Sequence, residues 1–267
     1  MDSNVFTAIL LGILEGLTEF LPVSSTGHLI LASELLGFTG ESSVTFKIAI
    51  QFGAILAVIA VYWQRFWGVG MGLLKGRADD IAFTRNVFLG FAPALVIGVL
   101  AYEAVRAAIQ TPMIVAVALI IGGILMLVLE RMVKTVRVKS VETMPATTAL
   151  GIGLVQCIAM IPGVSRSGAT ILGALTMGVD RKTAAEYSFF LAVPTMLAAT
   201  VYALWKDRAL LNADDFGMIA IGFGMAFLTA LFVVKGFVAV VTRYGFKPFA
   251  WYRIIAGSIA LIALLMK

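Results

Sequence analysis

Six stretches of this chain are each long and apolar enough to cross a lipid bilayer: 46-63, 86-104, 112-129, 187-204, 217-234 and 249-266. A spanning helix needs about 17 to 25 mostly apolar residues. Tryptophan is typical of membrane interfaces, and four tryptophans lie near the predicted ends of these stretches: Trp63, Trp67, Trp205 and Trp251. Only 13% of the residues are charged and 61% are hydrophobic, a composition outside the range of soluble domains. The sequence therefore predicts an all-α integral membrane protein with six transmembrane helices.

Two more apolar regions, 5-37 and 148-178, are interrupted midway by proline and a cluster of serine, threonine and glycine. Each flank has about 11 to 16 residues, or about 16 to 24 Å of helix, which is too short for a hydrocarbon core of about 30 Å. We predict a re-entrant helical hairpin in each region. Glu15 follows residues 5-14 and no basic residue precedes them, so we expect mature structure here and not a signal peptide.

Basic residues predict the orientation. Segments 64-85, 130-147, 180-186 and 235-248 together carry thirteen of the twenty Lys and Arg residues, and the opposite set of segments carries five. Lys and Arg concentrate in cytoplasmic loops. Both termini are then expected to face outward, with the first hairpin entering from outside and the second from the cytoplasm. The net charge of +5 is thus interpreted as a signal for orientation, and no nucleic-acid partner is expected.

An internal repeat organises the single membrane domain, 1-267. A shift of 141 residues places GILEGLTEFLPVSSTG (12-27) over GLVQCIAMIPGVSRSG (153-168), and the same shift pairs the span 46-63 with the span 187-204. We predict repeat one over 1-135 and repeat two over 147-267, each a hairpin followed by three crossings. Three is an odd number, so the repeats must be inverted. Inverted repeats with broken helices place their ligand site at the interrupted segments.

Hydroxyl groups lie at both breaks, where the second half-helix of each hairpin begins. Such positions favour N-caps, and the free N–H groups of a helix start bind anions. The predicted phosphate-binding residues of this kind are Ser24, Thr26, Gly27, Ser165, Ser167 and Gly168, with Ser25 as a further hydroxyl. Arg166 adds a planar cation suited to phosphate oxygens. The alternative is that these hydroxyls only cap short helices.

Two acidic residues precede the first break, and one histidine follows it. Glu15 and Glu19 are four residues apart and share one helix face, where burial calls for compensation by a divalent cation, by Arg166 or by protonation. The alternative is a water-exposed pair without chemistry. His28 is the only histidine, and it is interpreted as a general acid/base or nucleophile, against a packing role. Arg253 is expected to snorkel to the interface.

The strings EGLTEFLPVSSTGH (15-28) and PGVSRSGAT (162-170) resemble the signature motifs of the bacterial undecaprenyl-diphosphate phosphatase family, the bacitracin-resistance type. The resemblance implies hydrolysis of undecaprenyl diphosphate to the monophosphate carrier for cell-wall synthesis, in the bacterial inner membrane, with bacitracin resistance as a consequence. It implies a cofactor cation, Mg or Ca, and a site open to the periplasm. It assigns the family's acidic pair to Glu15 and Glu19 and its histidine to His28. The hydroxyl cluster and the arginine with its neighbours fall on Ser24, Ser25, Thr26, Ser165, Arg166, Ser167 and Thr170.

Several alternatives stay open at this point. The nucleophile is Ser25 with His28 as base, His28 itself, or water. The main rival function is a secondary transporter or flippase of lipid phosphates, because inverted repeats with broken helices are a transporter design. A structural membrane scaffold is disfavoured by the cost of polar groups in lipid. The sequence does not decide between a monomer and a homodimer.

Overall fold

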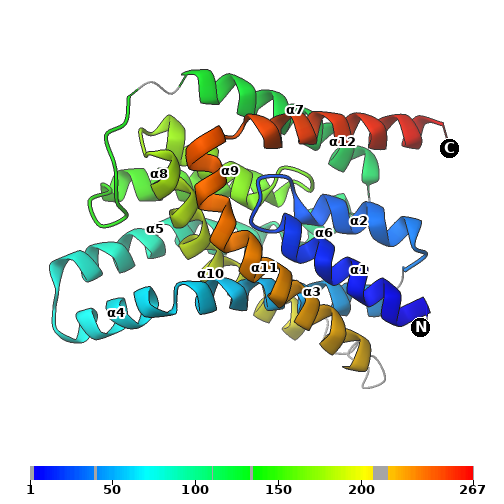
Figure 1. Ribbon diagram of the computed structural model, residues 1–267, viewed down its shortest axis with the longest axis horizontal. Helices are drawn as coiled ribbons and strands as arrows, with labels where there is room; N and C mark the ends of the chain where they lie inside the picture. Colours follow the sequence, from blue (N-terminus) through cyan, green and yellow to red (C-terminus); the bar gives the residue numbers. More distant parts are fainter. Residues whose placement is uncertain (1–2, 39–40, 110, 133–134, 207–215, 267) are drawn as a thin grey trace.

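The computed structural model describes residues 3–38, 41–109, 111–132, 135–206 and 216–266 (Figure 1). Nearly all of these residues lie in helices, and within the described ranges the β-structure is limited to an isolated parallel bridge between Val138 and Val179. The helical class predicted from the sequence is therefore confirmed.

The elements follow one another in a simple order. In the first half of the chain they are α1 (Ser3–Thr18), α2 (Ser25–Leu35), α3 (Glu41–Val61), α4 (Trp63–Leu74), α5 (Ala78–Leu100), α6 (Tyr102–Ile109) and α7 (Pro112–Met132). In the second half they are α8 (Ala146–Gln156), the 3₁₀ turn η1 (Cys157–Met160), α9 (Arg166–Thr176), α10 (Arg181–Lys206), α11 (Phe216–Tyr244) and α12 (Lys247–Leu265).

Five of the described helices, α5, α7, α10, α11 and α12, are long and apolar enough to cross a membrane. A sixth crossing exists only if α3 and α4 count as one span, and these two helices meet at a bend of 70°. The protein is therefore a multi-pass membrane protein. The helix of the predicted span 217-234 continues to Tyr244, because a lysine at 235 marks the expected edge of the membrane but does not end a helix.

Both interrupted regions form two short helices on either side of a break. In the first region α1 ends at Thr18 and α2 begins at Ser25. In the second, α8 with η1 ends at Met160 and α9 begins at Arg166. The two helices of each region pack against each other. The predicted helix, break and helix are thus confirmed at both places.

The four basic segments gather at one end of the molecule. Arg65 of the first segment forms an ion pair with Glu142 of the second. Glu130 accepts hydrogen bonds from Arg181 at 2.9 Å and from the backbone N–H of Phe246 at 3.1 Å, which joins the other two. Figure 1 shows the turn between α4 and α5 at the left, and the start of α1 and the end of α12 together at the right. The predicted outward loop 205-216 lies mostly outside the described residues.

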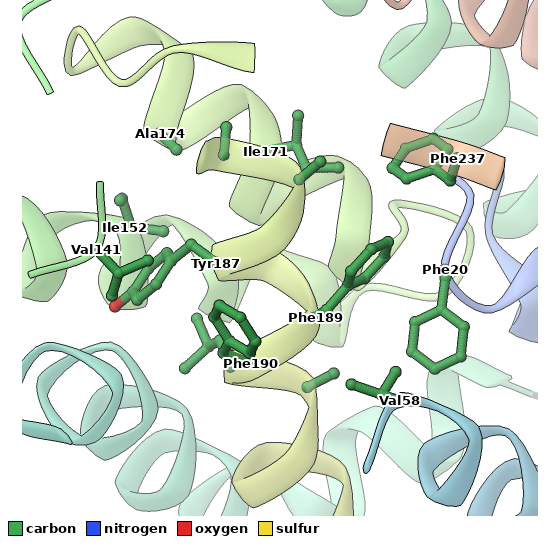
Figure 2. Packing of buried hydrophobic residues seen from close by; sticks show 14 of the residues in the cluster. Phe20, Val58, Val141, Ile152, Ile171, Ala174, Tyr187, Phe189, Phe190 and Phe237 are labelled. Atoms are coloured by element: carbon green, nitrogen blue, oxygen red, sulfur yellow. The ribbon is translucent and has the colours of Figure 1, made fainter. Parts of the chain in front are cut away.

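The core is built around α10, which contains an internal proline, Pro194. Figure 2 shows the aromatic side chains of this helix inside the bundle. The ring of Phe189 lies 5.6 Å from the ring of Phe20 and 5.8 Å from the ring of Phe237. Because Phe20 directly follows Glu19 at the first break, the apolar core fixes the position of that break.

Candidate active site

The two breaks, which are remote in the chain, meet inside the bundle. The hydroxyl of Ser167 donates a hydrogen bond of 2.8 Å to the backbone carbonyl of Leu21, and the guanidinium of Arg166 reaches Glu19. The contact predicted from the repeat is therefore present. Side chains from the first and second break share one buried environment, as a composite site requires.

Each break contains a serine with a positive φ, and the 141-residue shift pairs these two serines. Ser24 has a φ of 70° and Ser165 a φ of 77°, and no other non-glycine residue in the described part of the chain has a positive φ. The Ser24 side chain accepts from the N–H of Gly27, and the Ser165 side chain accepts from the N–H of Gly168. Left-handed backbone costs a non-glycine residue free energy and is typical of functional sites.

Arg253 holds the two breaks together, which corrects its predicted place at the membrane interface. Its side chain is 1% exposed. Its Nη1 donates to the carbonyls of Pro22 at 3.1 Å and Val164 at 2.9 Å, and its Nη2 donates to the carbonyl of Gly163 at 2.9 Å. The prediction that Arg253 reaches the membrane interface is wrong. The two breaks leave backbone carbonyl groups without helix partners inside the bundle, and the guanidinium, which has five N–H donors, binds them instead.

The charged centre of the site consists of Glu19, Arg166 and Ser25. Arg166 Nη2 lies 3.0 Å from Glu19 Oε1, and the hydroxyl of Ser25 donates to Glu19 Oε2. Glu19 is 6% exposed. Both of its carboxylate oxygens are thus occupied, one by the predicted phosphate clamp and one by the predicted nucleophile. Ser25 is paired with Glu19, not with His28.

Hydrogen bonds to Ser188 fix the position of the Arg166 guanidinium. Its Nη1 donates to the backbone carbonyl of Ser188 at 2.8 Å and lies 3.3 Å from the Ser188 hydroxyl. Thr170 donates to the same hydroxyl at 2.8 Å. Thr170 is fully buried, so it supports the arginine and does not face the ligand space. Ser188 on α10 was not found from the sequence, and a serine in an apolar span was its only signal.

Glu15 lies one turn before Glu19 and is fully buried. Neither of its carboxylate oxygens accepts a hydrogen bond from any residue that the structure describes. A buried carboxylate without donors needs a positive partner or a proton. The water-exposed pair considered as an alternative is therefore wrong.

A cavity of about 170 Å³ adjoins this centre. Its polar wall contains side chains from both breaks and one from α3; they are Glu19, Ser24, Ser25, Thr26, Gln51, Ser165 and Arg166. Its apolar wall includes Val105 of α6 and Met196 of α10. The cavity is large enough for a phosphate group or several water molecules. Gln51 and Met196 were missed in the sequence, although an amide within an apolar span was a usable signal for Gln51.

His28 is not brought to this cavity. Its Nδ1 lies 2.7 Å from the carbonyl oxygen of Ser24, and its Nε2 lies 2.7 Å from the hydroxyl of Tyr252 on α12. The two rings also stack, with centroids 5.5 Å apart. Because a carbonyl only accepts, Nδ1 carries the proton and Nε2 accepts from tyrosine. In this arrangement the His28 ring fixes the first break, and among the described residues its two nitrogens bond to Ser24 and Tyr252 and not to another predicted catalytic side chain.

The side chains of the site supply only some of the ligands that a cation needs. No group of three or more His, Cys, Asp or Glu side chains that would hold a metal ion occurs in the described ranges. Glu15 and Glu19 supply two carboxylates, and the oxygens of Glu15 accept no hydrogen bond. Mg²⁺ is commonly held by one or two carboxylates together with substrate phosphates and water. The donor set therefore suits a cation that arrives with a phosphorylated substrate.

Comparison with known proteins gives a consistent result over the whole chain. The family described as bacitracin resistance protein BacA matches residues 8–259. The undecaprenyl-diphosphatase of Sphingopyxis alaskensis is 69% identical over 264 residues, which cover 99% of both chains. That of Rhizorhabdus wittichii is 59% identical over 267 residues and 100% of both chains. The undecaprenyl-diphosphatase 2 of Paramagnetospirillum magneticum is 51% identical over 260 residues, 97% of this chain and 99% of its own.

Proposed function

Because the chain belongs to the bacitracin resistance protein BacA family, we propose that it hydrolyses undecaprenyl diphosphate to undecaprenyl phosphate and inorganic phosphate. The relatives at up to 69% identity are undecaprenyl-diphosphatases by name. The observation that carries the proposal is the contact between Arg166 and Glu19 across the two breaks, next to a cavity inside a membrane protein. The product is the lipid carrier of cell-wall synthesis, and its regeneration confers bacitracin resistance.

Substrate binding uses groups from both breaks. The prenyl chain stays in the bilayer while the diphosphate enters the cavity, where Arg166 offers a guanidinium and Thr26 a hydroxyl. Arg166 is fixed by Ser188, so its charge is oriented before the substrate arrives. A donor that is already oriented stabilises developing negative charge without reorganisation. The N–H groups of Gly27 and Gly168 lie at the positive ends of α2 and α9, where they donate to the Ser24 and Ser165 side chains.

The position of Ser25 supports a serine nucleophile. Its hydroxyl already donates to Glu19, so Glu19 takes the proton as the oxygen attacks the terminal phosphorus. The bond from phosphorus to the bridging oxygen breaks, prenyl monophosphate leaves, and water then hydrolyses the phosphoserine. His28 holds the carbonyl of Ser24 next to the nucleophile. A trapped phosphoenzyme that is stable in acid supports this route, whereas an acid-labile phosphoramidate would assign the attack to His28.

A divalent cation, Mg or Ca, belongs to the same proposal. Glu15 and Glu19 would hold it, and it would supply positive charge to the diphosphate. The buried oxygens of Glu15, which accept no hydrogen bond from the described residues, support this assignment. Removal of the cation with a chelator should then lower phosphate release, and its return should restore it.

The placement in the membrane is also proposed. We assign the protein to the bacterial inner membrane with both termini and the cavity facing the periplasm, and the halves to inverted repeats. The basic segments that meet around Glu130 support the sidedness, and the matched backbone at Ser24 and Ser165 supports the repeat. A homodimer is compatible with this assignment, and mass measurement of the purified protein in detergent tests it.

Phosphate release from a soluble short-chain prenyl diphosphate by the purified protein tests the function. Hydrolysis in detergent, where no membrane separates two sides, supports the enzyme. A lipid-phosphate flippase would bind the substrate and release no phosphate. Accessibility of cysteines introduced over 20–28 and 162–170, probed from each side of the membrane, tests the orientation.

A further inference from the structure

Most polar groups around the cavity already have hydrogen-bond partners. Ser25 and Arg166 bind Glu19, Ser24 accepts from Gly27, and Ser165 accepts from Gly168. Each of these groups must give up or share a bond when a ligand enters. A side chain that lines the cavity without a partner offers its hydrogen bonds at no such cost.

Gln51 of α3 is a side chain of that kind. It lines the cavity together with Arg166 and Thr26, and its amide makes no hydrogen bond within the described residues. Gln51 is only partly buried, so its amide can bind a group that enters the cavity without first breaking a hydrogen bond to the protein. The side chain is therefore a free donor and acceptor at the cavity wall.

The helix that carries Gln51 is closely packed. The neighbouring side chains on α3, Ile50 and Ala54, are both fully buried, and α3 packs along α11. Phe52 adds a ring contact of 6.1 Å with Phe223 on that helix. The backbone that carries the amide is therefore fixed by packing before a ligand binds, which is the support that a binding group needs.

The fold itself does not require an amide at this position. The 141-residue shift pairs Gln51 with Ala192, which is fully buried on α10. The same backbone position in the second copy is therefore filled by a methyl group. The amide belongs to the cavity of the first copy, where the acidic pair also lies.

We propose that the Nε2 group of Gln51 donates a hydrogen bond to a phosphate oxygen of the diphosphate substrate. This inference rests on the proposed function. A neutral amide carries donors without a charge, so Glu19 does not draw it into an ion pair as it does Arg166. Gln51 then approaches the phosphate from α3, while the arginine approaches from the second break.

The variant Gln51→Met tests this contact, because methionine has a similar length without the donor. A hydrogen bond to a charged group predicts a loss of about 10- to 100-fold in kcat/KM, and weaker inhibition by inorganic pyrophosphate. Leu56→Met lies on the same helix away from the cavity, and it should retain the wild-type values. Wild-type protein that releases no phosphate would refute the proposed function, before any variant is compared.

Two outcomes would overturn the inference while the function stands. In the first, Gln51→Met hydrolyses the substrate and binds pyrophosphate as the wild type does. In the second, Gln51→Glu saturates with Mg²⁺ at a lower concentration than the wild type, which would make position 51 a cation ligand. The proposal instead expects Gln51→Glu to lose more activity than Gln51→Met, because a carboxylate repels the phosphate.

Discussion

Arg166 Nη2 lies 3.0 Å from Glu19 Oε1, although 147 positions separate the two residues in the chain. Both side chains are largely buried, with 13% of the arginine and 5% of the carboxylate side chain exposed. Buried ion pairs contribute little net stability, because desolvation offsets the attraction. A pair of this kind inside a membrane protein is therefore better explained by the proposed binding of the diphosphate.

Removal of the guanidinium should abolish most of the activity. Arg166→Ala leaves the substrate phosphate without its cation, and loss of one oriented donor lowers kcat by about 10² to 10³. Arg166→Lys keeps the charge but loses the planar fork, so it should recover only part of the rate. Phosphate release at saturating substrate measures the effect. Size-exclusion profiles that match the wild type show that both variants are folded.

The acidic pair should control the response to the cation. Glu15→Gln keeps the shape of the side chain and removes one negative charge, so a higher concentration of Mg²⁺ or Ca²⁺ should be needed for half-maximal activity. A titration of phosphate release against each cation gives this concentration. An unchanged titration with a lower maximal rate would assign Glu15 to proton transfer instead.

Arg253 should contribute to stability more than to chemistry. Arg253→Ala leaves several buried carbonyls of both breaks without a donor, and each unsatisfied group costs about 1 to 3 kcal/mol. The thermal unfolding midpoint in detergent should fall clearly. Arg65→Ala is the matched control, because the Arg65 side chain is 39% exposed and a surface ion pair contributes only about 0 to 1 kcal/mol. Equal midpoints for the two variants would contradict the clamp.

The position of His28 separates a supporting role from a chemical one. His28→Asn retains a donor that reaches the carbonyl of Ser24, whereas His28→Ala does not. If His28 supports the break, kcat should be higher for the asparagine variant than for the alanine variant. Equal and severe losses in both would show that the imidazole itself transfers a proton or attacks phosphorus.

The sequence predicted the elements whose signal is local. The two breaks were identified because proline and hydroxyl residues interrupt apolar runs that are too short to span, and the structure confirms a helix on each side. Helix ends were less certain, since α11 continues to Tyr244 beyond the expected membrane edge. Hydropathy reports where lipid begins and ends, and it does not report where backbone hydrogen bonds stop.

Part of the site was predictable, because a charged side chain inside a membrane needs a partner that compensates its charge. This reasoning predicted that Arg166 lies near the acidic pair, and the structure places its guanidinium against Glu19. It failed for Arg253, which was expected at the interface, because the carbonyls that it binds exist only once both breaks have folded. It also missed Gln51 and Ser188, whose side chains are neutral and whose importance depends on which face of a helix meets the cavity.

A double-mutant cycle on Glu19 and Arg166 tests most directly that both breaks act on one diphosphate. The values needed are kcat/KM of phosphate release for the wild type, Glu19→Gln, Arg166→Gln and the double variant. Residues that act as a unit give strongly non-additive losses, so the double variant should be little worse than the poorer single variant. Fully multiplicative losses would contradict a single composite site.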